Sequence, residues 1–165
     1  MVPRITTDRL LLREIHLDEF DDFADSVADP IGQRYTSGGM DRRTAWRTFT
    51  SMMGQWMLTH AGWWGIEVRA TSRVVGHVGA FVRDTTPGIE LGWGLYRDAW
   101  GQGYAREAAI AARDFAIHSR NAKRLIAHID IGNKPSIRVS EHLGMHYERD
   151  VDFFGKAIGL YVLER

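Results

Sequence analysis

Apolar residues in the first part of the chain follow a strand pattern and then a helical one. A compact apolar run at residues 9–15 predicts a first strand. Apolar side chains then recur three or four positions apart, which predicts a short helix that Asp18 caps and that stops near Pro30. The same spacing returns in a longer helix that Asp41 caps and Gly62 ends, with apolar positions at Trp46, Phe49, Met53, Trp56 and Met57.

Strands dominate the remainder of the chain, with two helices set between them. Two apolar runs predict a hairpin of residues 63–69 and 74–83, and another strand follows at residues 89–95. We expect a helix ending near Arg120, a short helix from Asn133, and three more strands at residues 124–130, 145–150 and 157–163. The order β-α-α-β-β-β-α-β-α-β-β indicates an α+β fold with a mixed sheet, in a single domain of residues 1–165.

Composition limits the classes of function. Lysine plus arginine and aspartate plus glutamate number 21 each, so nothing indicates a nucleic-acid or membrane partner. The chain has no cysteine, which excludes disulfides, a catalytic thiol and cysteine-ligated zinc. No apolar run approaches the roughly 18 residues of a membrane span. We therefore expect a soluble, cytoplasmic protein.

The glycine-bearing turn Trp100-Gly101-Gln102-Gly103-Tyr104-Ala105 lies between the strand at 89–95 and an alanine-rich helix. The first N–H groups of a helix have no internal partner, the helix dipole favours an anion there, and glycine lets a phosphate come close. The turn therefore predicts a phosphate or pyrophosphate site. The P-loop pattern is absent, and Arg106 stands where a dinucleotide fingerprint needs a small residue. A turn that binds no ligand is the remaining alternative.

A second segment, from Asn133-Lys134-Pro135-Ser136 to Leu143-Gly144-Met145, follows about 30 residues later. Together the two segments resemble the GCN5-related N-acetyltransferase (GNAT) family. The turn is similar to that family's acetyl-coenzyme A pyrophosphate loop, Q/R-x-x-G-x-G/A, with Trp100, Gly103 and Ala105 at its three defined positions. The second segment is similar to the N-x-x-[AS]…L-G-[FM] helix. The residues of these two motifs, with those of the opening strand at 7–13, most resemble the branch that acetylates ribosomal-protein N-termini.

The resemblance implies a mixed, mostly antiparallel sheet flanked by helices, acetyl-coenzyme A as cosubstrate, and no metal. It also implies direct acetyl transfer in a ternary complex to a primary amine, either a protein N-terminal α-amine or a small-molecule amine. The cofactor would enter a gap between the strands at 89–95 and 124–130, and Arg97 or Arg106 could meet its phosphates. Implied cofactor-binding residues are Trp93, Gly94, Leu95, Trp100, Gly101, Gln102, Gly103, Tyr104, Ala105, Arg106, Asn133 and Ser136. Backbone N–H groups near residues 93–95 would bind the oxyanion.

Two residues are the first candidates for acid–base chemistry. Glu90 begins the strand beside the expected cofactor, and an apolar setting could raise the pKa of its carboxyl toward the working range. The alternatives are His77 as base, or Glu90 as a carboxylate at a solvent-facing edge. Ser140 falls where many family members carry a tyrosine acid, so we expect it to donate a hydrogen bond to the leaving sulfur. A solvated helix serine is its alternative, and Asn133 has a second interpretation as an N-cap.

Other features leave alternatives open. Gly92 and Gly94 in a strand interior predict a bulge or a close approach to a ligand. His142 and His146 are not read as a metal site, because Gly144 is expected to end the helix between them. The missing tyrosine also admits a coenzyme A-binding sensor or interaction module without turnover. The closing strands could pair across a homodimer.

Overall fold

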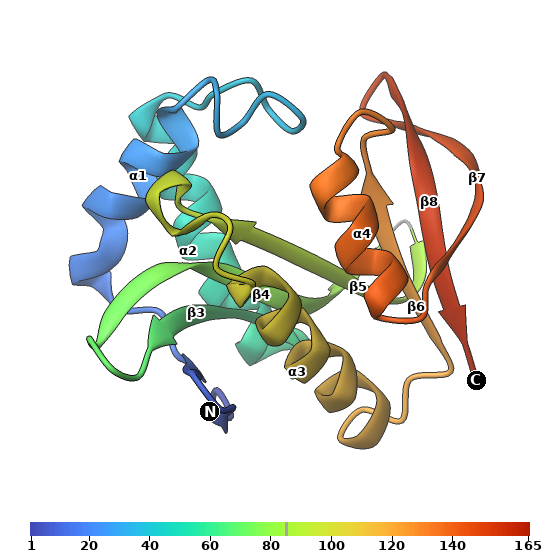
Figure 1. Ribbon diagram of the computed structural model, residues 1–165, viewed down its shortest axis with the longest axis horizontal. Coiled ribbons are helices and arrows are strands. Elements are labelled where there is room, and N and C mark those ends of the chain that lie inside the picture. Colours follow the sequence, from blue (N-terminus) through green and yellow to red (C-terminus); the bar gives the residue numbers. More distant parts are fainter. Residues whose placement is uncertain (85) are drawn as a thin grey trace.

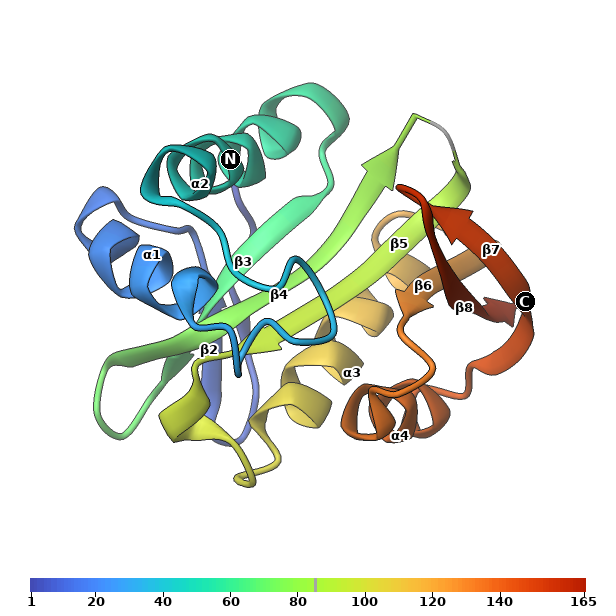
Figure 2. The ribbon, with the colours of Figure 1, turned by 90° about the horizontal axis from the view of Figure 1, so that it is seen from above.

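One twisted sheet runs through the molecule, with helices on both of its faces (Figures 1 and 2). The computed structural model describes residues 1–84 and 86–165. The described strands lie in the order β1-β2-β3-β4-β5-β6-β8-β7. They are β1 (Ile5–Thr6), β2 (Leu10–Arg13), β3 (Gly62–Val68), β4 (Arg73–Arg83), β5 (Thr86–Leu95), β6 (Arg124–Ile129), β7 (His146–Phe153) and β8 (Lys156–Glu164). The helices are α1 (Phe20–Ala28), α2 (Arg42–Thr59), α3 (Tyr104–His118) and α4 (Lys134–His142).

The predicted order and fold class are confirmed, with small differences at the boundaries. A short strand, β1, precedes the expected first strand and pairs with β2. The carboxylate of Asp41 accepts a hydrogen bond from the N–H of Thr44 at 2.6 Å and so caps α2 as expected. The expected cap at Asp18 is wrong, because this residue lies inside the short helical turn Leu17–Glu19 that precedes α1. No helix in the described ranges combines the length and apolar character that a membrane span requires.

Strands β5 and β6 pair side by side over a short distance and then separate. They are parallel, and their described register consists of Ile89 with Leu125 and Glu90 with Ile126. The antiparallel ladder between β4 and β5 continues to Leu95, so the second half of β5 stays with β4 and leaves β6. The divergence is visible in Figure 1. We call this place the β5–β6 fork; it agrees with the expected gap between the two strands.

Buried apolar side chains on both faces of the sheet hold it between the helices. Small side chains let α3 lie close against β4 and β5, since Ala108, Ala109, Ala112 and Ala116 are all buried. On the opposite face α1 and α2 pack through Phe23 and Phe49, whose ring centroids are 5.3 Å apart. Helix α2 buries Phe49 and Trp56, but Met57, which shares their predicted spacing, is exposed. The sheet and α3 therefore fix the position of the glycine-bearing turn between the end of β5 and the start of α3.

Candidate functional site

The glycine-bearing turn delivers the chain directly into α3. Gly101 and Gly103 both have φ of +77°, a left-handed conformation that favours glycine. Gly103 is the N-cap of α3, and no side chain among the described residues caps this helix. The N–H groups of Tyr104, Ala105 and Arg106 therefore lie in a first turn that offers them no intrahelical acceptor. This is the arrangement expected of an anion site.

Arg9 holds this turn in place through its contacts with Gln102 and Glu107. The sequence did not predict this role for Arg9. Its guanidinium donates to the carbonyl of Gln102 at 2.9 Å and to the carboxylate of Glu107 at 2.7 Å, and it lies 4.8 Å from the centre of the Tyr104 ring. Thr7 donates to the same carboxylate at 2.6 Å. Burial would raise the pKa of Glu107, but the hydrogen bonds from Thr7 and Arg9 outweigh it and the pKa is lowered. Glu107 is therefore an ionised anchor for the turn.

Side chains around the turn differ in their availability to phosphate. The Trp100 indole donates to the carbonyl of Leu95 at 3.0 Å, which ties the turn to the end of β5. Arg97 forms an ion pair with Asp29 at 3.2 Å. Arg106 is exposed, and the described residues supply it with no ion-pair partner. Of the two expected phosphate-binding arginines, Arg97 is thus paired with a carboxylate, and Arg106 is the one whose charge the described residues leave available for phosphate.

Helix α4 contributes the polar residues expected from the second segment. Asn133 caps it, accepting a hydrogen bond from the N–H of Ser136 at 3.2 Å. The hydroxyl of Ser136 lies 3.3 Å from the indole nitrogen of Trp93, which donates to it and joins α4 to β5. Ser140 has no exposed surface, and its hydroxyl donates to the carbonyl of Ile137 at 2.8 Å. It is therefore not the solvated serine of the alternative interpretation.

Glu90 lies at the β5–β6 fork and is only 5% exposed, so the alternative of a solvent-facing carboxylate is wrong. Arg83 on β4 donates to its two carboxylate oxygens at 2.7 and 3.2 Å. Nδ1 of His128, on β6, lies 3.1 Å from Oε1. Burial raises the pKa of Glu90, as expected from its apolar strand, but His128 and Arg83 outweigh burial and the pKa is lowered. The expected upward shift is therefore wrong, because the sequence did not reveal these two partners.

His77 occupies an aromatic core rather than the fork. It is 5% exposed, and the rings of Phe23 and Tyr96 lie 5.3 and 5.8 Å from its own. Burial, with a smaller contribution from the charge of Arg13, lowers the pKa of His77 to about 3. This neutral side chain has the surroundings of a core histidine, which argues against the alternative of His77 as base.

Gly92 and Gly94, both on β5, lack a side chain for different structural reasons. The register of β4 with β5 is continuous from Glu90 to Leu95, so the expected bulge at Gly92 and Gly94 is absent there and an irregularity lies instead between Phe81 and Arg83. A Cβ at Gly92 would lie 2.6 Å from the Trp63 indole, whereas a Cβ at Gly94 would meet nothing within 4 Å. Gly92 therefore makes room for a side chain of the protein, and Gly94 leaves the strand open.

The segment between α1 and α2 crosses the open side of the fork (Figure 2). At one end Asp29 pairs with Arg97, just beyond β5. Further along, Tyr35 reaches the turn after β6, where a Cβ on Gly132 would lie 3.1 Å from its ring. Residues 29–35 thus connect the ends of β5 and β6, above the face that carries Glu90 and Gly94.

Comparison with known proteins identifies the family of this chain. The model of the acetyltransferase (GNAT) domain matches residues 9–146. The chain belongs to the GNAT acetyltransferase family. It is similar to the "Uncharacterized N-acetyltransferase p20" of Bacillus licheniformis, with 31% identity over 93% of this chain and 88% of that protein.

Solved acetyltransferase structures share the fold. An acetyltransferase from Agrobacterium tumefaciens superposes with a TM-score of 0.92 and 28% identity, covering 100% of this chain and 96% of that one. A ribosomal-protein-S5-alanine acetyltransferase from Vibrio fischeri gives a TM-score of 0.76 at 14% identity, covering 98% and 96%, which shows the common fold. Membership of the GNAT family implies acetyl transfer from acetyl-coenzyme A. The uncapped start of α3 and the β5–β6 fork fit that cosubstrate, since one offers N–H groups to phosphate and the other offers strand backbone to an extended arm.

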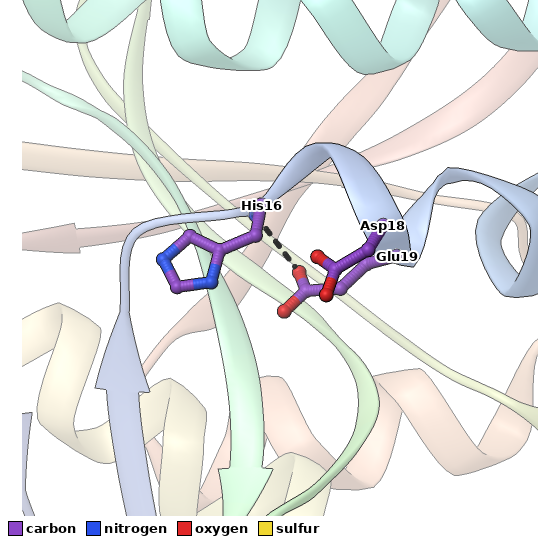
Figure 3. Close-up of side chains that lie close together, drawn as sticks. All are labelled: His16, Asp18 and Glu19. Carbon is purple, nitrogen blue, oxygen red and sulfur yellow. Dashed lines mark hydrogen bonds between the residues drawn. The ribbon is translucent and has the colours of Figure 1, made fainter.

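A separate cluster of His16, Asp18 and Glu19 lies at the start of the helical turn before α1 (Figure 3). The carboxylate of Glu19 accepts a hydrogen bond from the N–H of His16 at 3.1 Å and pairs with Arg13 at 2.6 Å. These contacts give Glu19 a structural role in starting the helix. We assign the cluster no part in the GNAT site.

Proposed function

We propose that this GNAT protein transfers an acetyl group directly from acetyl-coenzyme A to a primary amine in a ternary complex. The observation that carries the proposal is the uncapped, glycine-opened N-terminus of α3, held by Arg9 at the end of the strand that leaves β6. Backbone N–H groups of residues 103–106 would bind the pyrophosphate, with Arg106 supplying charge.

The second half of β5 would receive the rest of the cosubstrate. Beyond Glu90 its edge is no longer paired with β6 in the described register, so the pantetheine amides can pair with it as an added strand. Gly94 faces open space and lets the thioester lie close to the backbone. A backbone N–H near Trp93–Leu95 would then donate to the oxyanion of the tetrahedral intermediate.

Proton transfer would take place on either side of this thioester. We assign removal of the amine proton to Glu90 together with the side chains in contact with it, His128 and Arg83. Ser140 would donate to the leaving thiolate, which requires its hydroxyl to turn away from the carbonyl of Ile137. Asn133 and Ser136 would contact the cosubstrate arm from the start of α4. No covalent enzyme intermediate is needed.

The acceptor we favour is a protein N-terminal α-amine, with a small-molecule amine as the second class. The lowered pKa of Glu90 makes its carboxylate a weak base. An α-amine, with a pKa of about 8, needs little help to lose its proton at neutral pH, whereas a lysine amine near 10.4 needs more. A likeness in fold to a ribosomal-protein acetyltransferase is in keeping with this choice.

Release of free thiol from acetyl-coenzyme A tests the proposal. The acceptors are peptides with free N-terminal alanine, serine or methionine, the same peptides with blocked N-termini and one lysine, and a set of small amines. We expect turnover that depends on an unblocked amine and an acetylated product in the mass spectrum. Binding of acetyl-coenzyme A without turnover on any acceptor would support the sensor alternative instead.

A further inference from the structure

His128 lies beside Glu90 on the open face of the β5–β6 fork. Glu90 is paired with Ile126, and His128 is two residues further along β6, so its side chain points to the same face as that of Glu90. The core on the other face holds its neighbours Ala127 and Ile129. His128 is also the first residue on this face beyond the last described pair between β5 and β6. It therefore stands next to the space where the two strands diverge.

The imidazole is held in one orientation. Its ring stacks on Phe153 of β7, with centroids 4.5 Å apart and planes at 27°. Nδ1 is buried and lies 3.1 Å from Oε1 of Glu90, close but not aligned as a hydrogen bond. The side chain is 8% exposed, so one edge still meets solvent. With Nδ1 turned toward the carboxylate, Nε2 on the far side of the ring is the nitrogen left for a substrate.

Glu90 is restrained in a way that suits an orienting carboxylate. Arg83 occupies both of its oxygens, and the guanidinium lies over the rings of Phe81 and Phe153 at 5.5 and 5.1 Å. A carboxylate fixed by an arginine has little freedom to move toward an acceptor. An imidazole beside a carboxylate is the arrangement by which proteins hold a neutral base and stabilise it once protonated.

We propose that His128, through Nε2, takes the proton from the acceptor amine, and that Glu90 is a positioning residue that orients the ring and stabilises the imidazolium. The inference rests on the proposed acetyl transfer and names its base. It extends the site to a residue of β6.

The reaction then balances without an added reagent. The ammonium form of the acceptor gives one proton to Nε2, and His128 later releases it to water. The neutral amine attacks the thioester carbonyl, forming the C–N bond. Collapse of the tetrahedral intermediate breaks the C–S bond, and the second amine proton passes to the leaving thiolate. The products are the acetamide, the free thiol of coenzyme A and one proton.

Among the described residues, the charged groups around His128 come from the neighbouring strands. Glu90 faces it from β5, and Arg83 on β4 reaches it through Glu90. Strand β7 contributes the ring of Phe153, and Leu160 of β8 is the residue paired with it. On β7, Arg149 is paired with Leu160 and its guanidinium lies 3.5 Å from Glu148. Asp130 and Lys156, at the ends of β6 and β8, bond to each other at 2.5 Å.

The test compares His128→Gln and Glu90→Gln across pH, with His146→Gln as the control at an exposed strand position. We expect His128→Gln to lower kcat by at least about 100-fold and to remove the acidic limb of the kcat/KM profile. Its affinity for acetyl-coenzyme A should stay within twofold, and His146→Gln should match wild type. Glu90→Gln should keep an acidic limb, because the proposed base is still present, and should lower kcat, because the ring has lost the carboxylate beside Nδ1.

Other outcomes overturn the inference. If Glu90→Gln abolishes the limb while His128→Gln retains it, Glu90 is the base. If His128→Gln fails to fold, the presence or loss of the acidic limb in Glu90→Gln still decides between the two residues. Added imidazole should restore turnover to His128→Ala, an effect that a purely structural histidine would not show. If wild type turns over and His128→Gln has the same kcat and pH profile, only the role of His128 is removed. If wild type turns over no amine at all, the proposed function is removed as well.

Discussion

His77 and His128 lie on the same face of the sheet in opposite electrostatic surroundings. His77 is enclosed by Phe23 and Tyr96, with its Nε2 buried and unpaired. His128 has a carboxylate 3.1 Å from its Nδ1. The first environment penalises a charged ring, whereas the second places a carboxylate beside a ring nitrogen. At the residue scale, therefore, the neighbours decide which histidine can take part in proton transfer.

The buried state of His77 should make stability depend on pH. The unfolded chain protonates this histidine below about pH 6.5, but the folded protein does so only near its lowered pKa of about 3. Stability from this group is thus complete above about pH 6.5 and is lost as the pH falls toward 3. Between pH 7 and pH 5 we expect a loss of about 2 kcal/mol. Urea unfolding of wild type and His77→Leu should show this loss in wild type, and a variant with the same pH dependence would contradict it.

Gly92 and Gly94 provide a matched pair of substitutions on one strand face. Ala at position 92 would meet the Trp63 indole at 2.6 Å and Phe81 at 3.2 Å, and these two rings are stacked with centroids 4.8 Å apart. We expect Gly92→Ala to lower the free energy of unfolding by about 1–3 kcal/mol. Gly94→Ala, with nothing in reach, should change it by less than about 0.5 kcal/mol. Equal effects in chemical denaturation would show that the Trp63 contact does not explain Gly92.

At the scale of elements, α3 depends on the N-terminal segment for the shape of its first turn. Glu107 lies in that turn and carries a negative charge near the proposed pyrophosphate site. Arg9 neutralises this charge and also binds the carbonyl of Gln102. A residue almost 100 positions away in the sequence thus completes the proposed anion site.

Removing Arg9 should weaken cosubstrate binding. Arg9→Ala leaves the Glu107 carboxylate uncompensated beside the phosphates, so we expect the Kd for acetyl-coenzyme A to rise about tenfold, or about 1.4 kcal/mol. Combining it with Glu107→Gln should recover part of this loss. Calorimetric titration measures both, with Arg4→Ala as control, since Arg4 pairs with Glu14 away from the turn. An unchanged Kd in Arg9→Ala would remove Arg9 from the site.

For the whole molecule, the β5–β6 fork joins two parts of the sheet through a short pairing. On one side β2 to β5 form a continuous antiparallel ladder, and on the other β6 pairs with β8 and β8 with β7. The described register between β5 and β6 includes just two pairs, with α4 joined to β5 by the bond from Trp93 to Ser136. A ligand bound in the fork would add contacts between these two parts.

Acetyl-coenzyme A should therefore stabilise the whole fold. At a free concentration of 100 times Kd, binding adds about 2.7 kcal/mol to the free energy of unfolding. For a chain of this size that corresponds to a rise in Tm of roughly 5–10 °C. NAD should produce no shift. A shift with NAD and none with acetyl-coenzyme A would favour dinucleotide-dependent redox chemistry instead.

Local sequence was sufficient for most elements and for the turn that opens α3. Apolar periodicity located the helices and strands to within a few residues, because each element buries one face against the core. The cap at Asp41 was predictable because it needs only the next three residues, whereas Asp18 was misassigned because a short helical turn precedes α1. The raised pKa expected for Glu90 failed for another reason: Arg83 and His128 come from different strands.

The sequence by itself determined the order of elements, the glycine conformation at Gly103 and the cap at Asn133, since each depends on residues adjacent along the chain. Only the tertiary structure decided the environments of Glu90, His77, His128 and Gly92. Those environments follow from strand register, which brings together residues far apart in the sequence and sets how close charges and rings approach. Electrostatic and steric energies change steeply with these distances, and the distances exist only in the folded chain.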